Sequence, residues 1–387
     1  MFRISRTLPA LVALALAGCG TADEPRQPYG VTLNGAAPTP ASSPAAAPEP
    51  PPPPPPPAPY VEDARADLAQ TIDSLGEDFG GLLGIAVEDV DAGWTTAYNG
   101  ERMLPQQSVS KFWVSLTALD QADRGELDLD RTIVLTRKDL TLFHQPIRAE
   151  ILLRGSVRTT PRELMEQALT HSDNTANNAI LEAVGGPAAV STMMARHDIT
   201  GVRFGTDEIT KQSMIAGVDW KPRYSIANAF FDARDKVPEA KRRAAFEAYL
   251  DDPIDGATPL GMVHALSRLA RGELLSERST RLMIETLKRT HSGPRRLRGG
   301  REGDWVVAHK TGTGQFFEGR QSGYNDVGLV ISPGGRTYAV AVLIGWTRRP
   351  TIERMAMMQK VTRAVIAFDE ALQSGKAQGE SAAEADS

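Results

Sequence analysis

The stretch SVSKFWVSLTAL, residues 108–119, places a serine and a lysine three positions apart at the head of a run that is apolar on nearly every side. Such a run predicts a helix buried in a core. Ser108 would then lie in the first turn, where unpaired backbone N–H groups and the helix dipole favour negative charge. Lys111 lies on the same face, and a desolvated lysine can activate a serine hydroxyl. Taken alone, the pair is better explained by Ser108 as an ordinary helix N-cap.

A second polar segment, Ser172-Asp173-Asn174, comes just before a helix that the sequence predicts from about Thr175. Residues of these types cap helices, and capping alone explains their presence. The functional alternative places the hydroxyl of Ser172 in a cleft, where it passes a proton to a departing nitrogen. Asn174 would then bind a substrate amide.

A third segment, KTGTG at residues 310–314, follows the apolar residues 305–307. A strand with glycine at alternate positions leaves one edge bare, so a substrate backbone can pair with it. Lys310 and Thr311 would hold a carboxylate. The backbone N–H groups of Thr313 and Ser108 would form an oxyanion hole. The simpler alternative is a strand that ends in a flexible turn.

Around these segments, helical patterns fill the middle of the chain and strand patterns lie toward both ends. The predicted helices cover residues 63–75, 111–122, 161–170, 175–183, 187–195, 259–270, 277–287 and 351–372. The predicted strands cover residues 84–90, 95–98, 305–309, 326–332 and 338–345. This order favours an α+β fold in which distant segments close one antiparallel sheet, flanked by helices and by an all-helical lobe.

Together and in this order, the three polar segments resemble the signature of class A β-lactamases and penicillin-binding proteins. The resemblance runs from about Gly84 to the last helix. It implies a β-lactamase/transpeptidase-like fold and a serine acyl-enzyme, without metal or cofactor. The catalytic residues that it implies are Ser108, Lys111, Ser172 and Glu208. The substrate-binding residues that it implies are Asn174, Lys310, Thr311, Gly312, Thr313, Phe143 and Gln212.

Glu208 is the residue that separates a β-lactamase from a peptidase in this interpretation. The stretch RFGTDEITKQ, residues 203–212, aligns with the family's loop that holds the deacylating water. Gln212 then replaces the usual Asn, with the same amide chemistry on a longer stem. The alternative is that Glu208 is one more solvated acid.

Two departures weaken the alignment around Glu208. The usual Pro and Leu of the loop are absent, and a long insertion with a helical stretch at residues 239–249 separates Gln212 from Asp255. Phe143 is similar to the aromatic residue that the family places at the cleft mouth. No arginine can be assigned to the carboxylate-binding role, for which Arg320 is only a guess.

The first residues resemble a bacterial lipoprotein export signal, residues 1–18, which ends at Leu16-Ala17-Gly18-Cys19. We expect lipidation of Cys19, and an ordinary secretory signal is the alternative. Residues 19–59 form a Pro-rich linker in this interpretation, residues 60–372 the hydrolase domain and residues 373–387 a disordered tail. These features predict a periplasmic protein anchored to a membrane, with the outer membrane favoured.

Composition and charge exclude some classes of partner for the 387-residue chain. Its net charge is −5, and no long basic block is present, so we expect no nucleic-acid partner. The six histidines show no metal-ligand spacing. We expect a monomer that hydrolyses small-molecule β-lactams. The alternatives are a D,D-peptidase acting on peptidoglycan and a non-catalytic cell-wall-binding lipoprotein.

Overall fold

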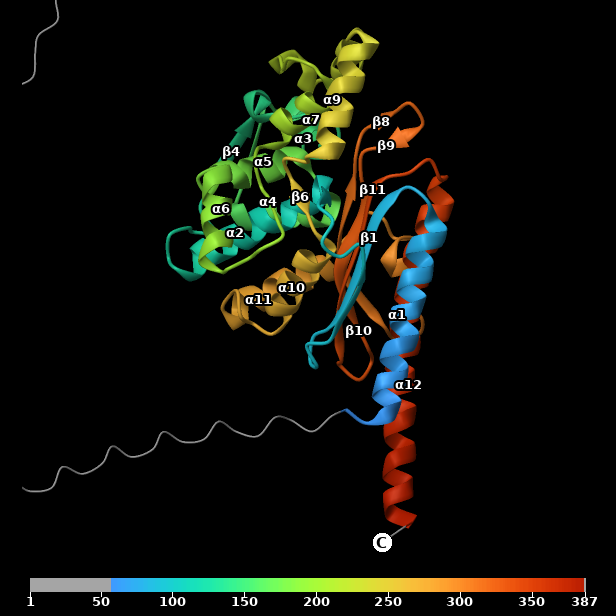
Figure 1. Cartoon of the computed structure of the whole chain (residues 1–387). Coiled ribbons are helices and arrows are strands. Elements are labelled where there is room, and N and C mark those ends of the chain that lie inside the picture. Colours follow the sequence, from blue (N-terminus) through green and yellow to red (C-terminus); the bar gives the residue numbers. More distant parts are fainter. Residues whose placement is uncertain (1–56, 386–387) are drawn as a thin grey trace, which may run out of the picture. The chain divides into compact units, whose positions relative to one another are not determined.

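The computed structural model describes residues 57–385; the predicted export signal, Cys19 and nearly all of the predicted linker lie outside them. The described part is built on an antiparallel sheet with the strand order β2-β1-β11-β10-β7 (Figure 1). Its strands are β1 (Leu82–Asp89), β2 (Thr95–Tyr98), β7 (Val306–Thr313), β10 (Tyr324–Ile331) and β11 (Thr337–Trp346). β7 is thus an edge strand, as expected for the strand that carries the KTGTG segment.

Helices and short strand pairs complete the fold. The helices are α1 (Pro59–Phe79), α2 (Lys111–Asp123), α3 (Arg148–Arg154), α4 (Pro161–Glu166), α5 (Asn174–Ala183), α6 (Pro187–Arg196), α7 (Glu208–Ala216), α8 (Ala229–Arg234), α9 (Glu239–Asp251), α10 (Pro259–Ala270), α11 (Glu277–Lys288) and α12 (Thr351–Ala385). The short strand pairs are β3 (Leu104–Pro105) with β6 (Gly256–Ala257), β4 (Ile133–Thr136) with β5 (Ser156–Thr159), and β8 (Phe316–Phe317) with β9 (Arg320–Gln321). None of the helices in the described residues has the length and apolar character that a bilayer span needs.

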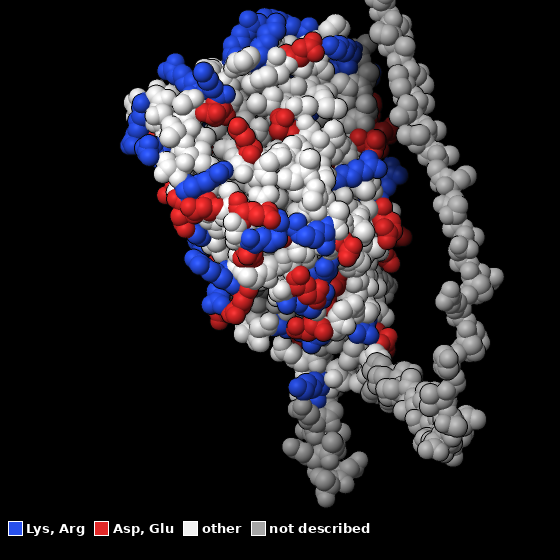
Figure 2. All heavy atoms as spheres, turned by 90° about the vertical axis from the view of Figure 1, so that its left-hand side faces the viewer, with Lys and Arg blue, Asp and Glu red and all other residues white. Residues whose placement is uncertain are grey.

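The sheet is buried on both faces. Alternate side chains along a strand point to opposite faces and so belong to two separate hydrophobic clusters. In β11, Val340 and Val342 join the cluster formed with α1 and α12, which lie side by side on one face (Figure 1). The intervening Ala341 and Leu343 join the cluster formed with α2, α10 and the helical lobe. This period of two is what a pleated strand imposes. On the lobe face, acidic and basic side chains are mixed over the middle and lower part, and basic side chains gather along the upper edge (Figure 2).

The sequence predicted the α+β class and the hairpin of β1 and β2 correctly, but several boundaries differ. The helix expected over residues 161–170 gives way to a π-helical turn at Gln167–His171. The strand expected to end at His309 continues to Thr313, because β10 pairs with it throughout. Helix α12 continues to Ala385, so the tail expected to be loose from residue 373 is helical there. Its Ala and Glu are good helix formers, and extending a helix needs no new nucleus.

The predicted insertion between α7 and β6 contains α8 and α9. Phe246 and Tyr249 of α9 pack with Ile215 of α7 and with Phe317 of β8. Arg243 of α9 also forms an ion pair with Glu318 of the β8–β9 turn. The insertion therefore packs between α7, which begins at Glu208, and the β8–β9 hairpin.

Candidate active site

Ser108 lies in a tight turn that distant residues hold in place. It belongs to the 3-10 turn Gln107–Ser110, so it precedes α2 instead of lying in its first α-helical turn. Gln107 has φ +54°, a costly conformation for a residue with a side chain. Its backbone N–H donates to Asp255 Oδ2 at 2.9 Å, and its Nε2 donates to the Tyr249 hydroxyl at 2.8 Å. These bonds stabilise the strained turn and fix the position of Ser108.

Lys111 is buried next to the Ser108 hydroxyl. Its Nζ donates to Ser108 Oγ at 2.6 Å and to Asn174 Oδ1 at 2.7 Å. Burial lowers the pKa of Lys111 to about 8, although the negative charge of Glu208 acts in the opposite direction. A lysine with a pKa this close to neutrality can exchange a proton with the hydroxyl that it contacts.

Ser172 and Asp173 make different contacts. Asp173 caps α5, since its Oδ1 accepts from the Ala176 backbone N–H at 2.9 Å. Ser172 has φ +61° and leaves its hydroxyl 3.1 Å from Lys310 Nζ. The capping interpretation therefore holds for Asp173, and Ser172 is placed at the boundary between the lobe and β7.

β7 brings Lys310, Thr311, Gly312 and Thr313 to the same boundary. Burial, and then the like charges of Lys111 and Arg296, lower the pKa of Lys310 well below its ordinary value. A bound anion would raise that pKa again. A Cβ at Gly312 would lie 2.3 Å from the Gln106 carbonyl oxygen, so glycine is required for the close approach of β7 to the turn of Ser108.

Arg296 is the cation that the sequence did not identify. It is buried, and its Nη1 donates to the Gly312 carbonyl at 2.9 Å while its Nη2 donates to Thr313 Oγ1 at 2.5 Å. Arg320, the guess made from the sequence, is wrong: it forms an ion pair with Glu247 of α9 and is absent from the cleft lining among the described residues. No local pattern in the sequence distinguishes the two arginines, because Arg296 precedes β7 and Arg320 follows it, both at a short distance along the chain.

Glu208 begins α7, whose N-cap is Asp207. Its Oε1 accepts from Gln212 Nε2 at 2.9 Å, and its Oε2 lies 3.0 Å from Lys211 Nζ. Burial favours a raised pKa for Glu208, but the charges of Lys211 and Lys111 outweigh it and hold the pKa at about 2. Glu208 is therefore a buried carboxylate and not a solvated acid.

Gln212 connects Glu208 to two further glutamines. Its Nε2 also donates to Gln107 Oε1 at 2.9 Å, and its Oε1 accepts from Gln315 Nε2 at 2.9 Å. Both N–H groups of the Gln212 amide are thus used, and one lone pair of Oε1 stays available. No local pattern indicates Gln107 or Gln315, because their contacts with Gln212 span about a hundred residues of chain.

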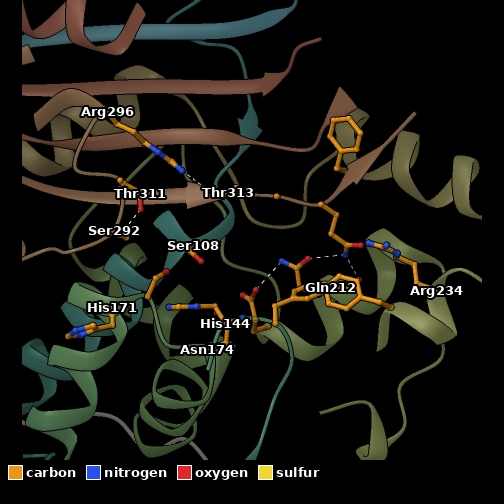
Figure 3. A pocket seen from close by; sticks show the side chains of 18 residues that line it. Ser108, His144, His171, Asn174, Gln212, Arg234, Ser292, Arg296, Thr311 and Thr313 are labelled. Carbon is orange, nitrogen blue, oxygen red and sulfur yellow. Dashed lines mark hydrogen bonds between the residues drawn. The ribbon is translucent and has the colours of Figure 1, made fainter. Parts of the chain in front are cut away.

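These groups surround a cavity of about 500 Å³ (Figure 3). In Figure 3, Arg296, Thr311 and Thr313 approach from the strand side, and Asn174 and Gln212 approach from the helical side. The predicted site residues that line the cavity are Ser108, Phe143, Ser172, Asn174, Glu208, Gln212, Thr311 and Thr313. Lys111, Lys310 and Gly312 are buried in contact with those residues or with the nucleophile turn.

The insertion contributes part of the cavity wall. Phe231 and Arg234 of α8 line the cavity, and the ring of Phe231 lies 5.3 Å from that of Phe143. Phe143 also packs edge-to-face on Phe230 at 5.1 Å. Phe143, which the sequence predicts at the cleft mouth, thus packs against α8 of the insertion.

Comparisons with known proteins agree with this geometry. The profile of the "Beta-lactamase enzyme family" matches residues 67–368. The "Extended-spectrum beta-lactamase PER-1" of Pseudomonas aeruginosa is 29% identical over 307 residues, which cover 78% of this chain and 87% of that protein. The "Carbapenem-hydrolyzing beta-lactamase KPC" of Klebsiella oxytoca is 28% identical over 302 residues, which cover 78% of this chain and 85% of that protein.

Solved structures show the same architecture. A beta-lactamase from Chitinophaga pinensis DSM 2588 is 27% identical with a TM-score of 0.64, and the match covers 80% of this chain and 99% of that one. An ancestral (GNCA) class A beta-lactamase is 29% identical with a TM-score of 0.61, and the match covers 78% of this chain and 99% of that one.

Proposed function

The chain belongs to the beta-lactamase enzyme family, and from that membership we propose which of its residues open and release a β-lactam. It is a serine β-lactamase: it hydrolyses the β-lactam amide through a serine acyl-enzyme, which destroys the antibiotic and confers resistance. One observation carries the assignment of roles. Lys111 Nζ lies 2.6 Å from Ser108 Oγ, in a site that also holds the ionised Glu208.

In acylation, Ser108 Oγ attacks the β-lactam carbonyl carbon and its proton passes to Lys111. The backbone N–H groups of Ser108 and Thr313 stabilise the oxyanion, and loss of one such donor typically costs about 3–4 kcal/mol. The C–N bond then breaks, and Ser172, which contacts Lys310, supplies the proton that the nitrogen needs. We assign this first proton transfer to Lys111 because its Nζ lies 2.6 Å from Ser108 Oγ; Glu208, or a water between the two, is the alternative.

In deacylation, Glu208 removes a proton from a water that attacks the ester carbon. Glu208 Oε1 and Gln212 Oε1 each keep a lone pair for that water. The ester C–O bond breaks, and Ser108 regains its proton. Deacylation distinguishes a β-lactamase from a D,D-peptidase, on which the penicilloyl adduct would persist.

The substrate carboxylate binds between Lys310, Thr311 and Thr313, with the Arg296 guanidinium beside them. Arg296 contributes positive charge there and holds Thr313 Oγ1 in place. Asn174 faces the acyl side chain, although its Oδ1 already accepts from Lys111 and its Nδ2 donates to the Leu142 carbonyl at 2.8 Å. One N–H and one lone pair of Asn174 are left for substrate.

The test is hydrolysis of a chromogenic cephalosporin by the chain without its first 56 residues. We expect turnover by the wild type and none by Ser108→Ala. Ser191→Ala is the matched control, since Ser191 lies on α6 outside the cleft, and it should keep wild-type activity. Turnover by Ser108→Ala would remove Ser108 from the mechanism, and a stable adduct with no turnover would indicate a peptidase.

We also propose that the chain is exported, cleaved before Cys19 and lipidated there, with the monomeric enzyme held on the periplasmic side of the outer membrane. The supporting features are the short apolar run that ends at Cys19 and the Pro-rich segment that follows it. Fractionation of cells that express the full chain tests this. Wild type should be found in the membrane fraction, and Cys19→Ala should leave it; equal distribution of both would refute lipid anchoring.

A further inference from the structure

Lys211 is a buried cation that the proposed mechanism does not use. It lies on α7 three residues after Glu208, and its side chain is 3% exposed. Its Nζ lies 3.0 Å from Glu208 Oε2 and 3.2 Å from Asp255 Oδ2. It also approaches the Gln107 carbonyl oxygen at 3.4 Å. Lys211 therefore contacts the general base and the backbone of the residue before the nucleophile.

A buried lysine is costly unless opposite charges compensate it. Burial acts to lower the pKa of Lys211, but Glu208 and Asp255 outweigh burial and raise that pKa above its ordinary value. Asp255 is itself fixed, since it accepts from the Gln107 N–H at 2.9 Å and from the Tyr249 hydroxyl at 2.8 Å. The ammonium of Lys211 is thus held in one place between two anchored carboxylates.

The surroundings of Glu208 show what this ammonium does to the base. Three lysines act on Glu208 from three elements: Lys211 from α7, Lys111 from α2 and, through its charge, Lys310 from β7. Only Lys211 contacts Glu208 directly, at Oε2, and Gln212 contacts Oε1. Tyr249 of α9 and Asp255 are further titratable groups beside the Lys211–Glu208 pair.

We propose that Lys211 is a positioning residue for deacylation: it binds Oε2 of Glu208 and keeps this group an ionised base whose Oε1 faces the hydrolytic water. This inference rests on the proposed role of Glu208. It adds a second buried lysine to the site, with a task different from that of Lys111. Lys111 contacts the nucleophile, and Lys211 contacts the base.

The test compares Lys211→Met with Lys241→Met, because Lys241 is an exposed lysine of the insertion outside the cleft. In Lys211→Met we expect kcat to fall by roughly tenfold or more, because Oε2 of Glu208 loses the contact that orients the base, and misplacement of a catalytic group can cost about a hundredfold. The acid limb of the kcat profile should move up by about one pH unit or more. Mass spectrometry should show an accumulated acyl-enzyme, while the acylation rate changes less. Lys211→Arg should restore part of the deacylation rate.

Two outcomes decide against the inference. A folded Lys211→Met with wild-type kcat, an unshifted acid limb and no adduct would overturn it. If Lys211→Met does not fold, the double variant Lys211→Met/Asp255→Asn is measured instead, because Asp255→Asn removes the uncompensated charge. The single variant Asp255→Asn is its reference. Deacylation by the double variant at the rate of this reference would also overturn it. Failure of the proposed function looks different: Glu208→Gln would then deacylate normally.

Discussion

Arg296 Nη2 donates a hydrogen bond to Thr313 Oγ1 over 2.5 Å, while Nη1 donates to the carbonyl oxygens of Gly312 at 2.9 Å and Asn325 at 2.6 Å. The guanidinium also lies over the Tyr324 ring, 3.8 Å from its centroid. An arginine that is so tied to β7 and β10 presents a fixed positive charge at the strand side of the cleft. We therefore expect the carboxylate of a β-lactam to bind beside this guanidinium.

Replacement of Arg296 by alanine should therefore weaken substrate binding more than it slows chemistry. A hydrogen bond to a charged group contributes about 1.5–3 kcal/mol, so we expect KM to rise by roughly ten- to a hundredfold with a smaller change in kcat. Steady-state kinetics on a chromogenic cephalosporin measures both constants. Arg320→Ala is the discriminating control, because Arg320 is engaged by Glu247, and its KM should stay near the wild-type value. A larger KM effect at Arg320 would contradict this assignment.

The pH dependence of acylation should identify the base that activates Ser108. The pKa of Lys111 is lowered to about 8, so its neutral form grows as the pH rises toward that value. Since Lys111 contacts Ser108 directly, we expect the acylation rate, measured in single turnovers, to climb up to about pH 8 and then level. If Glu208 were the base, its pKa of about 2 would make the rate flat across neutral pH. A flat profile would thus assign the proton transfer to Glu208.

Residues that lie close together in the sequence could be assigned to the site before the fold was known, whereas residues that meet only on folding could not. Ser108 and Lys111 share a local spacing that survives even though a 3-10 turn replaces the expected helical start. Asp173 and Ser172 are adjacent, so their segment could also be identified from the sequence, although only the structure shows that Asp173 caps α5 while Ser172 contacts Lys310. Residues such as Gln107 and Lys211 have no such signal. The role of Gln107 comes from contacts with residues about a hundred positions away, and that of Lys211 depends on its burial between Glu208 and Asp255, which only folding brings about.

Glu208→Gln should block deacylation while acylation continues. The amide cannot accept the water proton as a carboxylate does, although its length and its contact with Gln212 can be kept. We expect mass spectrometry to show a trapped acyl-enzyme after mixing with penicillin, and turnover to be lost. Glu239→Gln is the control on an exposed acid of α9. If no adduct is trapped and turnover continues, Glu208 is not the deacylating base.

Glu208 should also make the fold sensitive to acid in a defined range. Its pKa is about 2 in the folded chain, against an ordinary value of 4.5, because Lys211 and Lys111 outweigh burial. A lowered pKa stabilises the fold above pH 4.5, and this contribution is lost as the pH falls from 4.5 toward 2. We expect urea unfolding to show that wild type loses stability relative to Glu208→Gln in that range. A difference that does not change with pH there would show that Glu208 does not titrate as described.

Phe246 should couple the insertion to the position of the general base. Its ring is buried against Phe317 at 5.6 Å and belongs to the cluster that includes Ile215 of α7, the helix that begins at Glu208. Phe246→Ala removes that packing, and a buried Phe→Ala change typically costs about 3–5 kcal/mol. We expect a lower free energy of unfolding in urea and, under conditions where the variant is folded, a deacylation rate that falls more than the acylation rate. Ile352→Ala, at a side chain that is 62% exposed, should change neither. Equal losses in both rates would mean that α9 supports the whole cleft and not α7 in particular.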